Sequence, residues 1–440
     1  MHESFPACKS FRQSAEVKQS SLFPGSFLYV PPSNRNEMNR PSLLVIILSV
    51  FIDLIGFGIV MPLLPIYSKT FGANGFEIGL IIASFSAMQF LFAPAWGRLS
   101  DRIGRRPVIL ISNAGSTLSY AAFALASTYS GSTGFWLLLA SRIFAGICGA
   151  NISVASAFIA DISPPEKRTQ RMGLIGMAFG LGFVFGPALG AFSYKMFGLT
   201  GPGWVAAGFC GFNFLFGLFA LAESRKPTGE TARPRPTLSQ WAYTLRQPTV
   251  GFVVAIYFLG TFCFACFEST FSLLVKDVFH YTPDQAGYLF AYCGVLAAFI
   301  QAGPIRRLNK RFGERRLITS SLMIVAASFL FIALSGSLAA LMLSVGLLAI
   351  GWGMNRPPAL GLISLSASAD EQGATMGVAQ GAASLARILG PMFASPLYAG
   401  HHAIPYFVCA GISFLAGLAA LFYLCRPSPA MSSPDPESAT

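Results

Sequence analysis

Three ionisable side chains lie inside long apolar stretches of this 440-residue sequence, where a charge is costly to keep. Asp53 lies within LLVIILSVFIDLIGFGIV, Arg142 within WLLLASRIFAGICGA, and Glu268 within FCFACFESTF. A carboxyl group held away from water takes up a proton readily, because desolvation favours its neutral form. The chemistry that these residues suit is therefore the binding and release of protons or of a charged substrate.

Each of the three residues also has a plainer structural interpretation, and both interpretations stay open here. Arg142 and Asp53 could form a purely structural ion pair, since a buried guanidinium needs a partner. Glu268 could lie near the outer end of its helix, in contact with water. In the functional alternative, Asp53 and Glu268 share one central site, where paired carboxylates attract protons and a cation.

The composition places these residues in a membrane. Apolar residues make up 54% of the chain and charged residues 11%, whereas an average soluble domain carries roughly 25% charge. A water-soluble fold of this size could not bury so much apolar surface. We therefore exclude a soluble enzyme, a disordered chain and a disulfide scaffold, and we expect no metal or other cofactor. The cysteines, including the C-x-x-C of Cys263 and Cys266, are expected to be reduced packing residues.

Apolar stretches long enough for a bilayer helix, about 20 residues each, recur twelve times along the chain. We expect an all-α membrane protein with transmembrane helices at 42–67, 77–97, 107–128, 135–157, 172–194, 201–222, 249–275, 286–304, 317–335, 338–363, 375–400 and 403–425. The polar, Pro-rich linker 223–248 separates two six-helix halves, 42–222 and 249–425. Segments 1–41 and 426–440 are expected to be disordered tails, and translation could start at Met1 or Met38.

The basic residues predict the orientation of the spans. The net charge is +12, but Lys and Arg form short clusters rather than a basic face, so nucleic acid is excluded as a partner. With both termini in the cytoplasm, 24 of the 30 basic residues lie in cytoplasmic segments, against three, Lys69, Lys195 and Lys276, in outer loops. This positive-inside bias predicts cytoplasmic termini. We expect a monomer in a bacterial inner membrane.

The two halves repeat each other in sequence. The loop GRLSDRIGRRPVIL at 97–110 aligns with RRLNKRFGERRLI at 306–318 after a shift of 209 positions. The stretch RMGLIGMAFGLGFVFGPALG at 171–190 aligns with TMGVAQGAASLARILGPMFA at 375–394 after a shift of 204. Parallel repeats of this kind place a substrate near the bilayer midplane, between halves that rock against each other. The sequence has no ATP-binding P-loop, so the energy must come from an ion gradient.

Four stretches make the sequence similar to the drug:proton antiporter branch of the major facilitator superfamily, and most similar to its tetracycline-efflux, or multidrug resistance, group. They are DLIGFGIVMPLLP at 53–65, GRLSDRIGRRP at 97–107, RIFAGICGA at 142–150 with IAD at 159–161, and GFVFGPALG at 182–190. The resemblance implies export by exchange with protons. It assigns Arg142 to proton coupling, and it implies an antiporter motif at Gly182, Gly186, Pro187 and Gly190.

The loop at 97–107 is expected to be a conformational latch. Its glycines permit tight helix ends, and Asp101 can meet Arg102, Arg106 or the positive N-terminal end of a neighbouring helix. Such contacts would stabilise one of the two conformations between which the halves rock. A loop that only follows the positive-inside rule would explain the arginines but not Asp101. The expected latch comprises Gly97, Arg98, Asp101, Arg102, Gly104, Arg105 and Arg106.

Polar amides within the spans are candidates for the substrate cavity, because an amide in lipid needs a partner. They are Gln89, Asn113, Asn151 and Asn355. Aromatic residues could line an apolar drug pocket, although each by itself more often packs in a core; the candidates are Phe85, Phe90, Phe179, Phe183, Tyr257, Phe264, Phe267 and Phe271. Arg387 lies in the middle of the eleventh span, and Arg356 is expected to extend to the cytoplasmic face.

These observations predict a proton-coupled secondary transporter, not an enzyme, that exports small amphiphilic or cationic compounds by alternating access. The alternatives are a proton symporter that imports a sugar, an organic acid or a peptide, and a non-transporting membrane receptor or scaffold. The sequence departs from the tetracycline-efflux pattern in two places. Ser119 precedes Tyr120 where an acid is expected, and the ninth span lacks an acid. These departures argue against tetracycline itself as the substrate.

Overall fold

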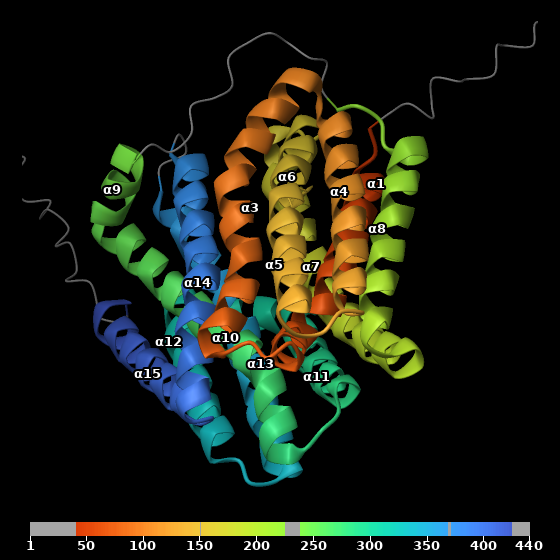
Figure 1. The fold of residues 1–440 in the computed structure, drawn as a ribbon. Coiled ribbons are helices and arrows are strands. Elements are labelled where there is room, and N and C mark those ends of the chain that lie inside the picture. The colour runs from red at the N-terminus through yellow and green to blue at the C-terminus, as the bar shows by residue number, and fades with distance from the viewer. Residues whose placement is uncertain (1–40, 150, 225–237, 368–370, 425–440) are drawn as a thin grey trace, which may run out of the picture. The chain divides into compact units, whose positions relative to one another are not determined.

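The computed structural model describes residues 41–149, 151–224, 238–367 and 371–424, and this part of the chain is helical apart from short connections. The predicted tails, except residue 41, and the stretch 225–237 of the predicted linker lie outside the described residues. The long helices (Figure 1) are α1 (Leu43–Val60), α3 (Gly75–Ile103), α4 (Arg105–Ala126), α5 (Gly131–Cys148), α7 (Pro165–Phe197), α8 (Gly201–Ala220), α10 (Pro248–Phe279), α11 (Pro283–Ala302), α12 (Pro304–Leu334), α13 (Leu338–Ser366), α14 (Gln372–Gly400) and α15 (Ile404–Leu424).

Ten stretches of the described chain are long and apolar enough to cross a membrane. One of them, Arg171–Ala220, contains most of α7 and all of α8, which are joined by the 3-10 turn η2 (Gly198–Thr200). Helix α14, which carries Arg387, is not among the ten, yet it packs on both α10 and α3. With α7 and α8 counted separately and α14 included, the bundle has the twelve long helical spans that the apolar pattern predicts.

The first span is interrupted near its end. Helix α1 gives way to the 3-10 turn η1 (Met61–Leu63), and the chain then continues as α2 (Leu64–Thr70). Pro62 lies inside this turn, and a proline lacks the backbone N–H that a continuing α-helix needs.

The fourth span is interrupted in its second half. Helix α5 ends at Cys148, and α6 (Asn151–Asp161) follows. Side chains of neighbouring helices bond the carbonyls that the break leaves free. Gln89 Nε2 donates to Gly149 O at 2.8 Å, and Trp96 Nε1 donates to Ile147 O at 2.5 Å. The break is therefore built into the packing, because buried carbonyls need partners.

The most extensive contacts between the two halves are those of α3 with α14 and of α7 with α11. Glycines permit the close approach: a Cβ on Gly79 would lie 2.6 Å from Pro391 O, and one on Gly294 would lie 2.5 Å from Phe183 O. A larger side chain at either glycine would push the halves apart.

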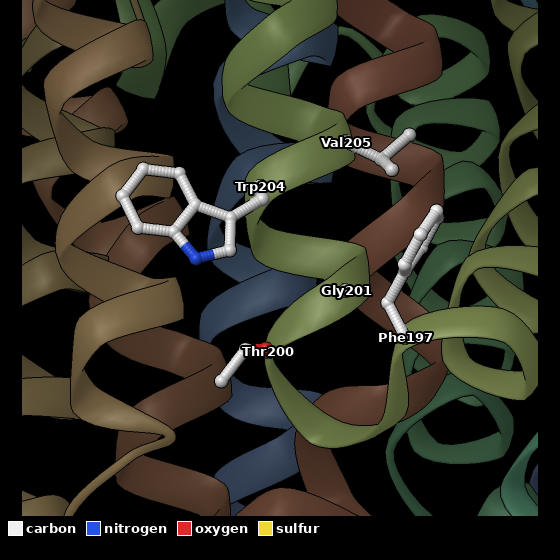
Figure 2. A pocket seen from close by; sticks show the side chains of 5 residues that line it. All are labelled: Phe197, Thr200, Gly201, Trp204 and Val205. Atoms are coloured by element: carbon white, nitrogen blue, oxygen red, sulfur yellow. The ribbon is translucent and has the colours of Figure 1, made fainter.

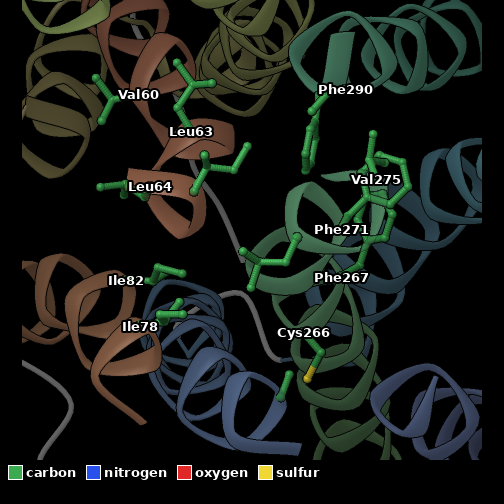
Figure 3. Packing of buried hydrophobic residues seen from close by; sticks show 14 of the residues in the cluster. Val60, Leu63, Leu64, Ile78, Ile82, Cys266, Phe267, Phe271, Val275 and Phe290 are labelled. Atoms are coloured by element: carbon green, nitrogen blue, oxygen red, sulfur yellow. The ribbon is translucent and has the colours of Figure 1, made fainter. Parts of the chain in front are cut away.

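An apolar cluster joins the halves at the end of the bundle where α1 and α10 finish. Leu63 and Leu64 belong to the same buried cluster as Phe267, Phe271 and Phe290 (Figure 3). The 97–107 loop lies at the opposite end of α3. In the predicted topology, the contact between the halves is thus closed on the outer side.

Polar contacts reinforce this closed end. Lys69 Nζ forms an ion pair with Asp277 Oδ2 at 2.7 Å, and the Tyr398 hydroxyl donates to the same oxygen at 3.1 Å. These three residues come from α2, α10 and α14. The side chains of Lys69 and Asp277 are 45% and 30% exposed, so water screens the pair and it contributes modestly to closure.

The predicted linker contains a helix that the sequence analysis did not anticipate, α9 (Leu238–Arg246). Helix α9 contacts α10 and α14. A Cβ on Gly381 of α14 would lie within 3 Å of the Trp241 indole. At least this part of the linker is therefore packed against the second half.

Candidate functional site

Asp53 lies in α1 and is half-buried. The Cys210 thiol of α8 donates to Asp53 Oδ1 at 3.9 Å. One turn further along α1, a Cβ on Gly56 would lie 3.0 Å from Cys210 Sγ and 3.4 Å from the Tyr120 ring. The carboxyl group therefore points towards α8 and α4, inside the first half. Sequence reasoning missed Cys210, because a lone cysteine in an apolar helix gives no signal of its neighbours.

Arg142 lies in α5 and is 1% exposed. Its guanidinium carbon lies 5.2 Å from the centroid of the Tyr120 ring and 5.4 Å from that of Phe123. The Nε and Nη2 atoms have no hydrogen-bond partner within the described residues. The ion pairs seen in that part of the chain do not include Arg142 with Asp53. Two aromatic rings thus face the guanidinium through cation–π contacts.

Tyr120 connects these two ionisable residues. Its side chain is 4% exposed, and it interacts electrostatically with both Asp53 and Arg142. Asp53, Cys210, Tyr120 and Arg142 thus form one polar group inside the first half. The sequence analysis named Tyr120 only as the residue after Ser119. Its place inside the predicted span 107–128 is the signal that could have marked it as a neighbour of the buried charges.

Glu268 lies in α10 and is 5% exposed, so it is buried rather than bathed in water. It interacts electrostatically with Arg387 of α14 and with Cys293 of α11. No direct contact with Asp53 is seen in the part of the chain that the structure describes. The two acids therefore belong to different halves and do not form a close carboxylate pair in this conformation.

The amides predicted for the substrate cavity have varied surroundings. Gln89 bonds the helix break described above, and Asn355 is 2% exposed and donates from Nδ2 to Ser321 Oγ at 2.9 Å. Asn113 is fully buried. The side chain of Asn151 lies outside the described residues. Gln89 and Asn355 are thus engaged in helix packing.

Arg105 is the centre of the predicted latch. Its side chain is 5% exposed, and it forms ion pairs with Asp101 at 2.7 Å and with Asp161 at 3.1 Å. Asp101 thus pairs with Arg105, an arginine of the expected latch that was not among the partners predicted for it. Arg98 and Arg102 are exposed. The latch residues therefore split into a buried network around Arg105 and solvent-facing cations.

Glu223 completes this network from the predicted linker. Its carboxylate accepts the backbone N–H groups of Arg105 at 2.8 Å and of Arg106 at 3.1 Å. These groups begin α4, so Glu223 caps the positive end of that helix. Gly104 has a φ of +102°, and a Cβ there would collide with the Glu223 carboxylate. Glu223 was missed because the link depends on where α8 ends in space.

The glycines of the predicted antiporter motif pack against α1. A Cβ on Gly182 would lie 2.8 Å from Leu54 Cβ, and one on Gly186 would lie 2.5 Å from Gly58 Cα. Gly190 approaches the Ile59 carbonyl in the same way. Pro187 lies within α7, and its carbonyl faces Gly287 of α11. Helix α7 is thus clamped between α1 of its own half and α11 of the other half.

The described cysteines are buried and free. Cys263 and Cys266 donate to the backbone carbonyls of Cys409 and Gly390, at 3.8 and 3.5 Å. This agrees with the packing role expected for them.

A separate pocket lies at the turn between α7 and α8. It has a volume of about 480 Å³ and is lined by Phe197, Thr200, Gly201, Trp204 and Val205 (Figure 2). Trp204 is 50% exposed, and none of the five lining side chains is ionisable. The pocket is distant in sequence from both acids, and nothing ties it to their chemistry.

Repeated helix bundles with buried ionisable groups in each half define a secondary-transporter fold. The sequence matches the Major Facilitator Superfamily over residues 46–391 and 300–439, and the chain belongs to that superfamily. It is an integral membrane transporter and not an enzyme.

The relatives of known sequence include tetracycline resistance proteins. The class C tetracycline resistance protein of Escherichia coli is 32% identical over 400 residues, which cover 88% of this chain and 96% of the relative. The human major facilitator superfamily domain-containing protein 10 is 29% identical over 448 residues, which cover 88% and 96%. The resemblance to the tetracycline-efflux group seen in the sequence motifs is thereby confirmed.

Solved structures agree with this assignment. The crystal structure of the human organic anion transporter MFSD10 has a TM-score of 0.65 and 28% identity, and the match covers 86% of this chain and 98% of the other. A bacterial homologue of the human lysosomal transporter Spinster, in an inward-facing and occupied conformation, has a TM-score of 0.66 at 17% identity over 88% and 98%. The second likeness shows the fold.

Proposed function

We propose that the protein is a proton-coupled exporter of small amphiphilic compounds that works by alternating access. The observation that carries the proposal is the placement of one membrane-embedded acid in each half, Asp53 on α1 and Glu268 on α10. An acid kept at the cost of desolvation marks an ion or substrate pathway. We further propose that the chain functions as a monomer in a bacterial inner membrane, with cytoplasmic termini.

Two other features support exchange rather than symport. The sequence shares the glycine motif of α7 with the antiporter branch, and the relatives include tetracycline resistance proteins. A human relative is described as an organic anion transporter. These names point to small organic substrates, in agreement with the aromatic side chains between the halves.

The test is reconstitution of the full chain in liposomes that contain a pH-sensitive dye. Tetracycline, and then a panel of other amphiphiles, is added outside at equal pH. Exchange predicts that entry of a substrate releases lumenal protons, so the lumenal pH rises. A fall in lumenal pH would indicate symport, and an unchanged pH with every compound would contradict proton coupling.

The network around Arg105 provides a further prediction. Asp101→Asn should lower turnover about tenfold, because removing one partner of a buried cation unbalances the two-state equilibrium, and 1.4 kcal/mol is a tenfold change. Turnover is measured in the liposome assay with the panel compound that gives the largest proton signal. Arg102→Gln is the matched variant, since Arg102 is exposed, and it should cost much less. Equal effects of the two substitutions would contradict the role of the network.

A further inference from the structure

We infer that the substrate is an aromatic anion, bound between the halves by the guanidinium groups of Arg356 and Arg387 and by the stacked rings of Phe264 and Trp352. The inference rests on the proposed transport function and specifies the charge and shape of its substrate. Of the amphiphilic or cationic compounds expected from the sequence, it favours amphiphiles that carry a negative charge.

A flat aromatic surface forms the first part of this site. Phe264 of α10 and Trp352 of α13 stack with ring centroids 4.2 Å apart and an interplanar angle of 5°. Both rings are half-buried. Phe183 of α7, from the other half, lies 6.5 Å from Phe264. A planar ring system entering between the halves would find partners for stacking from both sides.

Two arginines form the second part. The Arg356 guanidinium of α13 lies 5.4 Å from the centroid of Phe179 on α7, so it reaches across to the first half. Arg387 of α14 donates from Nη2 to Ser384 Oγ at 3.2 Å. The two guanidinium groups interact electrostatically with each other. Neither of them forms an ion pair with any residue that the structure describes.

The local charge balance favours an anion. Glu268 is the acid that interacts with Arg387, and it offsets one of the two positive charges at most. A half-buried cation without a counter-ion is costly, and a bound anion would remove that cost. Guanidinium groups are weakly hydrated and match the geometry of a carboxylate, which they bind through paired hydrogen bonds. An aromatic carboxylate therefore satisfies both parts of the site.

The experiment compares naphthalene compounds that share a ring system and differ in charge. Liposomes containing the full chain are loaded with unlabelled 2-naphthoate at equal pH on both sides, and entry of labelled 2-naphthoate is followed. This counterflow needs no pH gradient, so it reports on the substrate independently of proton coupling. We expect counterflow that is inhibited by external 2-naphthoate at a concentration at least about tenfold lower than by 2-naphthamide or 2-naphthylmethylammonium.

The arginine variants test the site itself. Arg356→Gln and Arg387→Gln should each raise the KM for 2-naphthoate about tenfold, as expected for one lost charge-assisted hydrogen bond. Arg356→Lys keeps the charge and should recover part of the loss. Arg311→Gln is the matched control, because Arg311 lies 5.5 Å from the Phe312 ring, and both residues are exposed. Its KM should stay at the wild-type value.

Three results would overturn the inference: absence of 2-naphthoate counterflow, stronger inhibition by the ammonium compound, or a wild-type KM in both glutamine variants. If a glutamine variant fails to elute as a single species in detergent, the inference is tested by the Arg356→Lys variant and by the comparison of 2-naphthoate with 2-naphthamide and 2-naphthylmethylammonium. A different result would contradict the proposed function: no compound of the panel would change the lumenal pH. A proton signal with cationic drugs, together with no naphthoate transport, would reject the anion while keeping the exporter.

Discussion

Asp53→Asn is expected to abolish substrate accumulation driven by a pH gradient while leaving counterflow at equal pH intact. Asparagine has nearly the same volume as aspartate and still accepts the hydrogen bond from Cys210, but it cannot take up a proton. Transport would then continue without coupling. The measurement is the accumulation of a panel compound in liposomes under an imposed pH gradient. This accumulation should fall to the level seen in liposomes without the protein.

Asp284→Asn is the matched control for this experiment. Asp284 lies in the first turn of α11, at the end of the bundle where that helix begins, and it is half-buried like Asp53. Its replacement should leave accumulation unchanged. Wild-type accumulation in Asp53→Asn would remove Asp53 from the mechanism and leave Glu268 as the coupling acid. Loss of counterflow as well would assign Asp53 to substrate binding instead.

The helices could be predicted from the sequence because a bilayer imposes simple rules on length and composition. Every backbone polar group within lipid must be bonded inside the chain, so apolar stretches of the right length become helices. Even α14, which carries Arg387, follows an apolar stretch that was predicted at 375–400. The break between α1 and α2 contains Pro62, a local signal. The break between α5 and α6 was harder to predict, because its carbonyls are bonded by side chains from another helix.

The candidate site was harder to predict, because hydropathy gives the depth of a residue but not the rotation of its helix. An ion pair between Asp53 and Arg142 was one of the interpretations that the sequence left open. The structure turns Arg142 towards Tyr120 and Phe123, and it places Cys210 next to Asp53. The same limit applies to Glu223, which lies far in sequence from the helix that it caps. Such contacts follow from packing between helices, which no local pattern encodes.

Gly186→Ala is expected to destabilise the protein and to remove most of its transport. The added Cβ would lie 2.5 Å from Gly58 Cα and 2.7 Å from the Gly58 carbonyl carbon. Both are backbone atoms, so one of the two helices must move, and overpacking of this kind costs about 1–3 kcal/mol. The same shift would disturb α11 on the opposite side of α7. For a chain of this length we expect an apparent Tm about 1–3 °C lower in detergent.

Gly180→Ala separates this steric effect from any general effect of alanine in α7. Gly180 lies in the same helix, and a Cβ there would meet no atom within 4 Å. Alanine favours a helix over glycine by about 1 kcal/mol, so this variant should keep or raise the Tm. A wild-type Tm and transport rate in Gly186→Ala would show that α1 and α7 can separate without loss. The clamp on α7 would then have no part in alternating access, because a contact that yields freely cannot hold one state of the bundle against the other.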